Sequence, residues 1–169
     1  TNGVMYGFSV VASNEFGSST ANTEATPSAG LPASIDIAPV ITDLEGSPVP
    51  LVGDELSVSD GEWSSSSGPV TYQWYSCSAP STDPAADAHC SLIAGATSSS
   101  YFVTSGDFGK YFAATVSATG TDGSTTTAAA ASIGPVKDVP HAPTNVVGSP
   151  RPNGTHLTWT APTNTGGSP

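Results

Sequence analysis

The chain has 169 residues with 14 acidic and 3 basic side chains, which gives a formal net charge of −11 at pH 7. Such a balance excludes nucleic-acid binding and docking to anionic membranes, because almost no Lys or Arg is present to pair with phosphate; diffuse binding of divalent cations stays open. The length allows one to two domains, and no apolar run approaches the ~20 residues that a bilayer-spanning helix needs, so no direct membrane insertion is expected.

Alternation of apolar and polar residues is the main structural signal of the chain. No stretch combines a helical period with caps, and turn residues recur at the roughly 8–12-residue spacing of all-β chains. In the first segment Tyr6, Phe8 and Val10 stand on alternate positions, which predicts a strand with one face available for burial. A turn at 14–17 and a polar strand over 18–25 follow. The sequence therefore predicts an all-β fold.

The middle of the chain carries the strongest strand pattern. Residues 70–75 form the best predicted strand, with Tyr72 and Trp74 on one face and Tyr75 on the other. A polar loop over 78–89 follows it, and the segment Thr-Asp-Gly at 121–123 predicts a hairpin turn. The other strands predicted here cover residues 40–41, 55–59, 90–93, 100–103, 111–118 and 124–133.

The chain has two cysteines, Cys77 and Cys90. Two cysteines in a Thr-rich β chain favour one disulfide and an oxidising compartment, so we expect an extracellular, secreted or cell-surface protein. A pair of free thiols is the alternative. No companion set of His or Cys residues points to a metal site.

Two short sequences, Tyr-Gln-Trp at 72–74 and Asp-Phe-Gly-Lys-Tyr at 107–111, resemble sequences of the immunoglobulin fold. The resemblance implies that Trp74 fills the core of a sandwich. It also implies that Tyr111, which follows a turn containing Asp107 and Gly109, forms a corner through a hydroxyl bond to the backbone. These four residues are therefore expected to define the fold.

Ala113 stands where the second inter-sheet cysteine of immunoglobulin domains would be, so that bridge is missing. The pair Cys77 and Cys90 instead resembles the bridge of bacterial Ig-like repeats in secreted surface proteins. Those repeats also carry Gly-x-Trp, found here at 61–63, and Gly-Ala-Thr, found at 95–97. The resemblance implies one complete Ig-like β-sandwich over 39–136.

The two ends of the chain resemble parts of fibronectin type III modules. The pattern over 2–17 is similar to their last two strands, with Tyr6 as the corner tyrosine, and 143–159 is similar to their first two, with Trp159 as a core residue. The expected organisation is a partial fibronectin type III sandwich at each end, over 1–26 and 143–169, joined to the Ig-like module by linkers at 27–38 and 137–142. The chain is then a piece of a longer string of modules, or a neighbour supplies the missing strands.

Few residues suggest chemistry. The three histidines are scattered, and no nucleophile, phosphate-loop or zinc-protease motif occurs, so we expect no enzyme, no catalytic residue, no cofactor and no metal site. Asp83, Asp87 and His89 are expected to lie in a solvated loop. Trp63 and Tyr75 are the candidates for a glycan-binding surface, although Trp63 is expected to cap an edge of the core.

The sequence therefore favours a structural repeat segment of an extracellular multi-domain protein that forms a stalk, sheath or filament through module–module contacts. The expected partners are neighbouring modules of the same chain and other copies of the same protein. The Thr-rich stretches at 20–26 and 124–127 are the edges offered for strand pairing. The alternative is an adhesion or glycan-binding accessory module, or a spacer of a secreted enzyme, with a surface glycan as partner.

Overall fold

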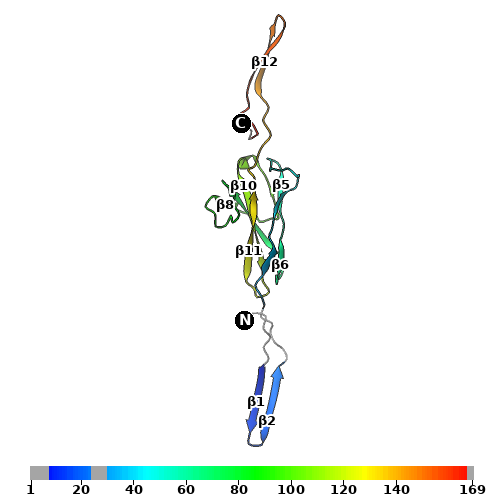
Figure 1. Ribbon diagram of the computed structural model, residues 1–169, viewed down its shortest axis with the longest axis vertical. Helices are drawn as coiled ribbons and strands as arrows, with labels where there is room; N and C mark the ends of the chain where they lie inside the picture. The colour runs from blue at the N-terminus through cyan, green and yellow to red at the C-terminus, as the bar shows by residue number, and fades with distance from the viewer. Residues whose placement is uncertain (1–7, 24–29, 167–169) are drawn as a thin grey trace.

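The structure, a computed structural model, describes residues 8–23 and 30–166. The described residues form an all-β chain with a single 3-10 turn, η1 (Ser105–Asp107). Figure 1 shows a central sandwich with one β-hairpin beyond each end. The strands are β1 (Phe8–Asn14), β2 (Gly17–Thr23), β3 (Ser34–Ile37), β4 (Ile41–Asp43), β5 (Glu55–Val58), β6 (Glu62–Ser64), β7 (Thr71–Cys77), β8 (Cys90–Leu92), β9 (Ser100–Phe102), β10 (Tyr111–Thr119), β11 (Thr125–Ile133), β12 (Thr144–Arg151) and β13 (Gly154–Thr160).

The central sandwich consists of antiparallel sheets. One sheet has the order β11-β10-β7-β8 and the other has the order β4-β5-β9, with β3 and β6 as a separate pair. The all-β sandwich predicted from sequence is therefore confirmed. The core between the sheets contains Trp74 and Phe112 as its largest fully buried side chains, and its other members include Leu56, Val58, Val103, Val116 and Val136.

Strand β10 holds the larger sheet together because it pairs with β7 on one side and β11 on the other. Phe112, Ala114 and Val116 belong to the core cluster, as their alternate positions require. Ala113 and Thr115, on the other face, are also buried. Shielding on both faces explains why β10 lacks a simple apolar–polar alternation.

The N-terminal linker predicted over 27–38 contains a strand, so the sandwich begins earlier than expected. Strand β3 pairs with β6, with Ile35 opposite Trp63. Just before it, Ala33 is buried, and its carbonyl accepts a hydrogen bond from the Thr126 hydroxyl at 2.7 Å. The six residues between Pro32 and Pro39, four of them in β3, give too short a pattern to separate a strand from a linker in sequence.

The terminal hairpins are two-stranded ribbons, β1 with β2 and β12 with β13. Their strand positions agree with the sequence patterns, but the expectation that Trp159 is a core residue is wrong within this chain, since its side chain is 60% exposed. Val10 is 70% exposed on the other hairpin. A ribbon of two strands has no second sheet to cover either face. Tyr6, the expected corner tyrosine, lies outside the described residues.

Candidate functional site

The disulfide predicted from sequence is confirmed. Cys77 at the end of β7 is bonded to Cys90 at the start of β8, and the two residues are direct partners in the strand register. The amide of Ser78 donates to the carbonyl of His89 at 2.9 Å, which closes the base of the loop over 78–89. A disulfide is compatible with an extracellular location. In the described ranges, no helix has the length and apolar character needed to cross a bilayer.

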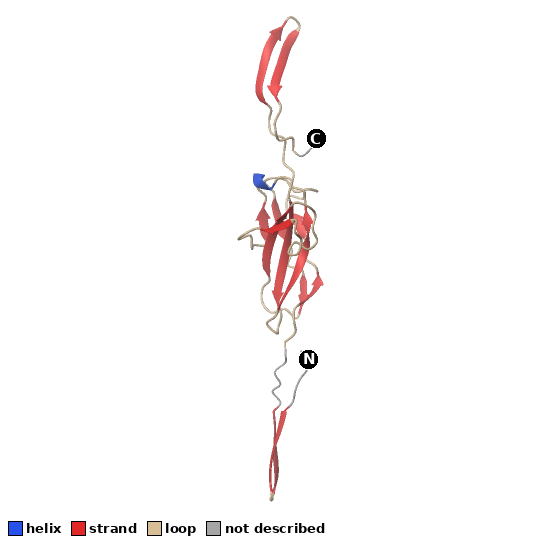
Figure 2. Ribbon diagram, turned by 90° about the vertical axis from the view of Figure 1, so that its left-hand side faces the viewer, coloured by secondary structure: helices blue, strands red, loops and turns tan. Residues whose placement is uncertain are grey.

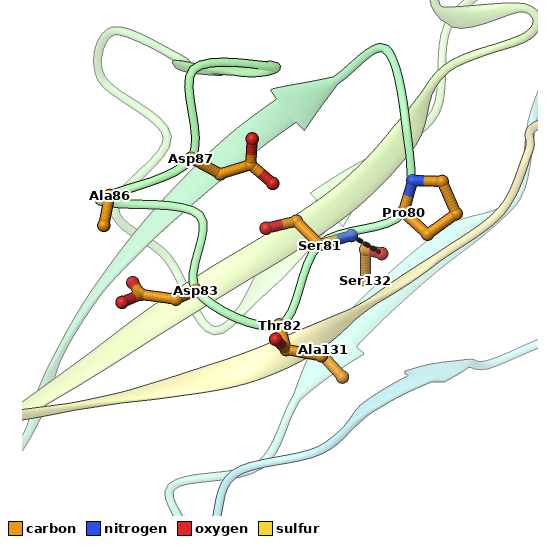
Figure 3. A pocket seen from close by; sticks show the side chains of 8 residues that line it. All are labelled: Pro80, Ser81, Thr82, Asp83, Ala86, Asp87, Ala131 and Ser132. Carbon is orange, nitrogen blue, oxygen red and sulfur yellow. Dashed lines mark hydrogen bonds between the residues drawn. The ribbon is translucent and has the colours of Figure 1, made fainter.

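The loop over 78–89 is also anchored to the edge strand β11 through Ser81. The Ser81 amide donates to the Ser132 hydroxyl at 2.8 Å, and the Ser132 amide donates to the Ser81 carbonyl at 2.9 Å. The resulting depression between the loop and β11 has a volume of about 480 Å³, and Figure 3 shows the side chains that line it. Its lining consists of Pro80, Ser81, Thr82, Asp83, Ala86, Asp87, Ala131 and Ser132.

The acidic side chains of this loop do not act as one ligand set. Asp87 Oδ1 accepts a hydrogen bond from the His89 amide at 2.9 Å and lies 3.0 Å from Nδ1 of the His89 ring. These bonds, together with the nearby Ser81 hydroxyl, lower the pKa of Asp87 below its ordinary value. The carboxylate of Asp83 points away from that of Asp87 (Figure 3). The depression therefore lacks the converging ligands that a metal ion requires.

Trp63 and Tyr75, the two candidates for a glycan-binding surface, lie in different sheets. Trp63 is in β6, packs against the core cluster and donates its indole N–H to the Asp60 carbonyl at 2.7 Å. Tyr75 is in β7, opposite Ala113 and Leu92. Both side chains are half-buried. They do not form a continuous aromatic strip on one sheet face.

A buried carboxylate, Asp107, organises the turn before β10. It accepts hydrogen bonds from the Thr104 hydroxyl at 2.7 Å, the Thr104 amide at 3.0 Å and the Tyr101 hydroxyl at 3.3 Å. The Nζ atom of Lys110 lies 3.5 Å from Oδ1 of Asp107. Gly109, with φ of +80°, supplies the left-handed conformation that this turn needs.

The tyrosine bonded at this turn is Tyr101, and its ring packs between those of Trp74 and Phe112 at centroid distances of 5.8 and 4.8 Å. The resemblance to the immunoglobulin fold implies a hydrogen bond from the Tyr111 hydroxyl to the backbone. Among the described residues, the Tyr111 hydroxyl makes no such bond. Tyr111 is half-buried and pairs with Cys77 across the strands. The tyrosine of β9, six residues before Asp107, therefore donates the hydrogen bond to the carboxylate of the turn.

The environment of Asp107 makes the stability of the sandwich depend on pH. Burial raises the pKa of Asp107, but the two bonds from Thr104 and the charge of Lys110 outweigh burial and hold the pKa below its ordinary value. A lowered folded-state pKa contributes stability above the unfolded-state pKa of about 3.9, and this contribution is lost as the pH falls through the folded-state pKa.

Asp107→Asn is expected to lower the free energy of unfolding at pH 7 by about 1–3 kcal/mol, because a buried charged acceptor is replaced by a weaker one. The difference from the parent chain should shrink as the pH falls below about 4, where Asp107 becomes protonated in the unfolded chain, and vanish below the lowered folded-state pKa of Asp107. Urea unfolding at pH 7 and at acid pH measures both effects. Asp122→Asn is the matched control, since Asp122 lies in an exposed hairpin turn and its carboxylate accepts a hydrogen bond from the Ser124 amide. An equal loss from both variants would contradict this role for Asp107.

One acidic cluster was not predicted from the sequence. Asp43, Glu45 and Asp54 each place a carboxylate oxygen within 4.8 Å of the others. Asp43 and Glu45 flank the end of β4, and Asp54 directly precedes β5. Antiparallel pairing of these strands, with Asp43 opposite Leu56, brings the three together. The spacing Asp-x-Glu followed by Gly-Asp at 53–54 was the only signal in sequence.

Comparisons of the chain with protein-family models, with curated proteins and with solved structures found no match.

Proposed function

We propose that this chain is a structural segment of an extracellular multi-domain protein, in which contacts between modules build a stalk, sheath or filament. The observation that carries the proposal is the exposed apolar surface of the two terminal hairpins. Figures 1 and 2 show these hairpins at opposite ends of the sandwich, along one long axis. Each hairpin offers a surface for a neighbouring module at its own end.

The exposed side chains of each hairpin gather on defined faces. Phe8 and Val10 stand on alternate positions of β1, as Leu157 and Trp159 do on β13, so each pair shares one face of its strand. All four side chains are more than half exposed. Clustered apolar side chains in water mark interaction surfaces, and a two-stranded ribbon needs further packing for stability.

The chain enters the sandwich through a fixed connection. The Leu31 amide donates to the Thr121 hydroxyl at 2.8 Å, and the Asp122 amide donates to the Leu31 carbonyl at 3.3 Å. A Cβ atom at Gly30 would lie 2.1 Å from the Thr121 carbonyl oxygen, so only glycine fits this approach. The segment that follows residue 29 is thus tied to the β10–β11 turn.

Hydrogen bonds also hold the linker that leaves the sandwich toward the C-terminal hairpin. The His141 amide donates to the Asn164 carbonyl at 3.1 Å, and the Asn164 side-chain amide donates to Asp138. The segment after β13 therefore returns to the linker before β12. These bonds hold the base of the C-terminal hairpin to the linker that leaves the sandwich, and a restrained connection between modules is a property that a stalk or filament requires.

Val10→Ser and Trp159→Ser are each expected to weaken association between copies of this chain, because each removes apolar area from a hairpin face. Sedimentation velocity over a range of concentrations should show self-association of the parent chain and a dissociation constant about ten-fold higher in each variant, equivalent to about 1.4 kcal/mol. Val40→Ser is the control, since Val40 is equally exposed on the sandwich itself. A parent chain that stays monomeric at every concentration would contradict the proposal.

A further inference from the structure

The cluster of Asp43, Glu45 and Asp54 has the construction of a cation site. Each carboxylate is held by one backbone amide through one oxygen. Asp43 Oδ1 accepts the Glu45 amide at 2.9 Å, and Asp54 Oδ2 accepts the Leu51 amide at 2.8 Å. Glu45 Oε2 accepts the Glu55 amide at 3.0 Å. One oxygen of each carboxylate is therefore engaged, and the carboxylates are oriented by the turns that carry them.

A second observation points to a missing ligand. Asp43 Oδ2 is fully shielded from solvent and has no hydrogen-bond partner in the described ranges of the chain. Asp54, beside it, is only 8% exposed. A buried carboxylate oxygen without a partner costs several kcal/mol unless a proton or a cation satisfies it. The carboxylates of the half-buried Asp43 and the buried Asp54 also repel each other.

We propose that Asp43, Glu45 and Asp54 bind one Ca²⁺ ion, with water completing its coordination. All three ligands are carboxylate oxygens on turns, which suits the flexible coordination by six to eight oxygens that Ca²⁺ prefers. Zn²⁺ favours His and Cys ligands, and neither residue belongs to the cluster. The ion would join the β4 end to the β5 start and brace the smaller sheet. This site does not depend on the proposed contacts between modules.

Isothermal titration of the whole chain with CaCl₂ at about 0.15 M NaCl tests the site. We expect one site with a dissociation constant of about 10⁻⁵ to 10⁻³ M, within the range of sensor and extracellular calcium sites. Saturating Ca²⁺ should also raise the melting temperature of the sandwich, because a ligand that binds only the folded state stabilises it. Sedimentation of the same samples separates this effect from association between copies.

Three variants identify the ligands. Asp43→Asn with Asp54→Asn should abolish binding, and Glu45→Gln, at an exposed position that the fold tolerates, should weaken it about ten-fold because one charged ligand is lost. Asp83→Asn with Asp87→Asn removes two acids elsewhere and should leave binding unchanged. Failure of about 10 mM Ca²⁺ to give either heat or a thermal shift would overturn the proposal, and so would an equal loss in the Asp83 and Asp87 variant, which would indicate diffuse binding.

Discussion

Trp74→Ala is expected to lower the free energy of unfolding of the sandwich by about 3–5 kcal/mol, the usual cost of deleting a buried aromatic side chain. Trp74 is fully buried at the centre of the core, its ring contacts that of Tyr101, and its indole N–H donates to the Ser98 carbonyl at 2.9 Å. Domains of this size have only about 5–15 kcal/mol of stability in total. The variant should therefore be unfolded or close to unfolding at 37 °C, as measured by urea denaturation with far-UV circular dichroism.

Trp159→Ala is the matched control for this prediction. It makes the same chemical change on a hairpin strand, where the side chain is mostly exposed, and it should leave the unfolding midpoint of the sandwich unchanged. If Trp74→Ala cost less than about 1 kcal/mol, or if the two variants lost equal stability, the core assigned here would be wrong.

Removal of the disulfide, by reduction or by replacing Cys77 and Cys90 with serine, is expected to cost ~3 kcal/mol. The bond closes a loop with a sequence separation of 13 residues, and the chain-entropy model gives roughly this value for loops of about 15 residues. Thermal unfolding with and without reductant measures the loss. Because the loop over 78–89 is also bonded to β11 through Ser81 and Ser132, the strands should keep their pairing after reduction.

The double serine variant supplies the control for reduction. Reductant should lower the melting temperature of the parent chain to that of the variant and should not change the variant itself. A parent chain whose melting temperature does not respond to complete reduction would show that the bond contributes nothing to the stability of the sandwich.

Much of the central fold was predictable because its signals are local. Alternation of apolar and polar residues predicted the strands around Trp74, and Thr-Asp-Gly at 121–123 predicted the hairpin turn between β10 and β11. The disulfide followed from two cysteines in a β chain. The strand β3 was missed because it has only four residues, lies between prolines and is fixed by its pairing with β6, while Leu31 before it bonds the β10–β11 turn.

The candidate sites were less predictable because they depend on contacts between side chains of different elements, which only the folded arrangement of the strands brings together. Tyr101 reaches Asp107 from a neighbouring strand, although the local pattern favoured Tyr111. The cluster of Asp43, Glu45 and Asp54 forms only when β4 pairs with β5. The exposure of Trp159 depends on which strands cover its hairpin, and the pattern of β13 alone cannot distinguish a covered face from an open one.

We propose that this chain serves as a structural segment whose modules contact their neighbours end to end. Electron microscopy of the native material that contains this chain tests this proposal. We expect regular fibres or stalks with an axial repeat close to the length of one or two modules. Isolated, flexible beads without regular contacts between modules would contradict it and would favour a spacer or an adhesion module.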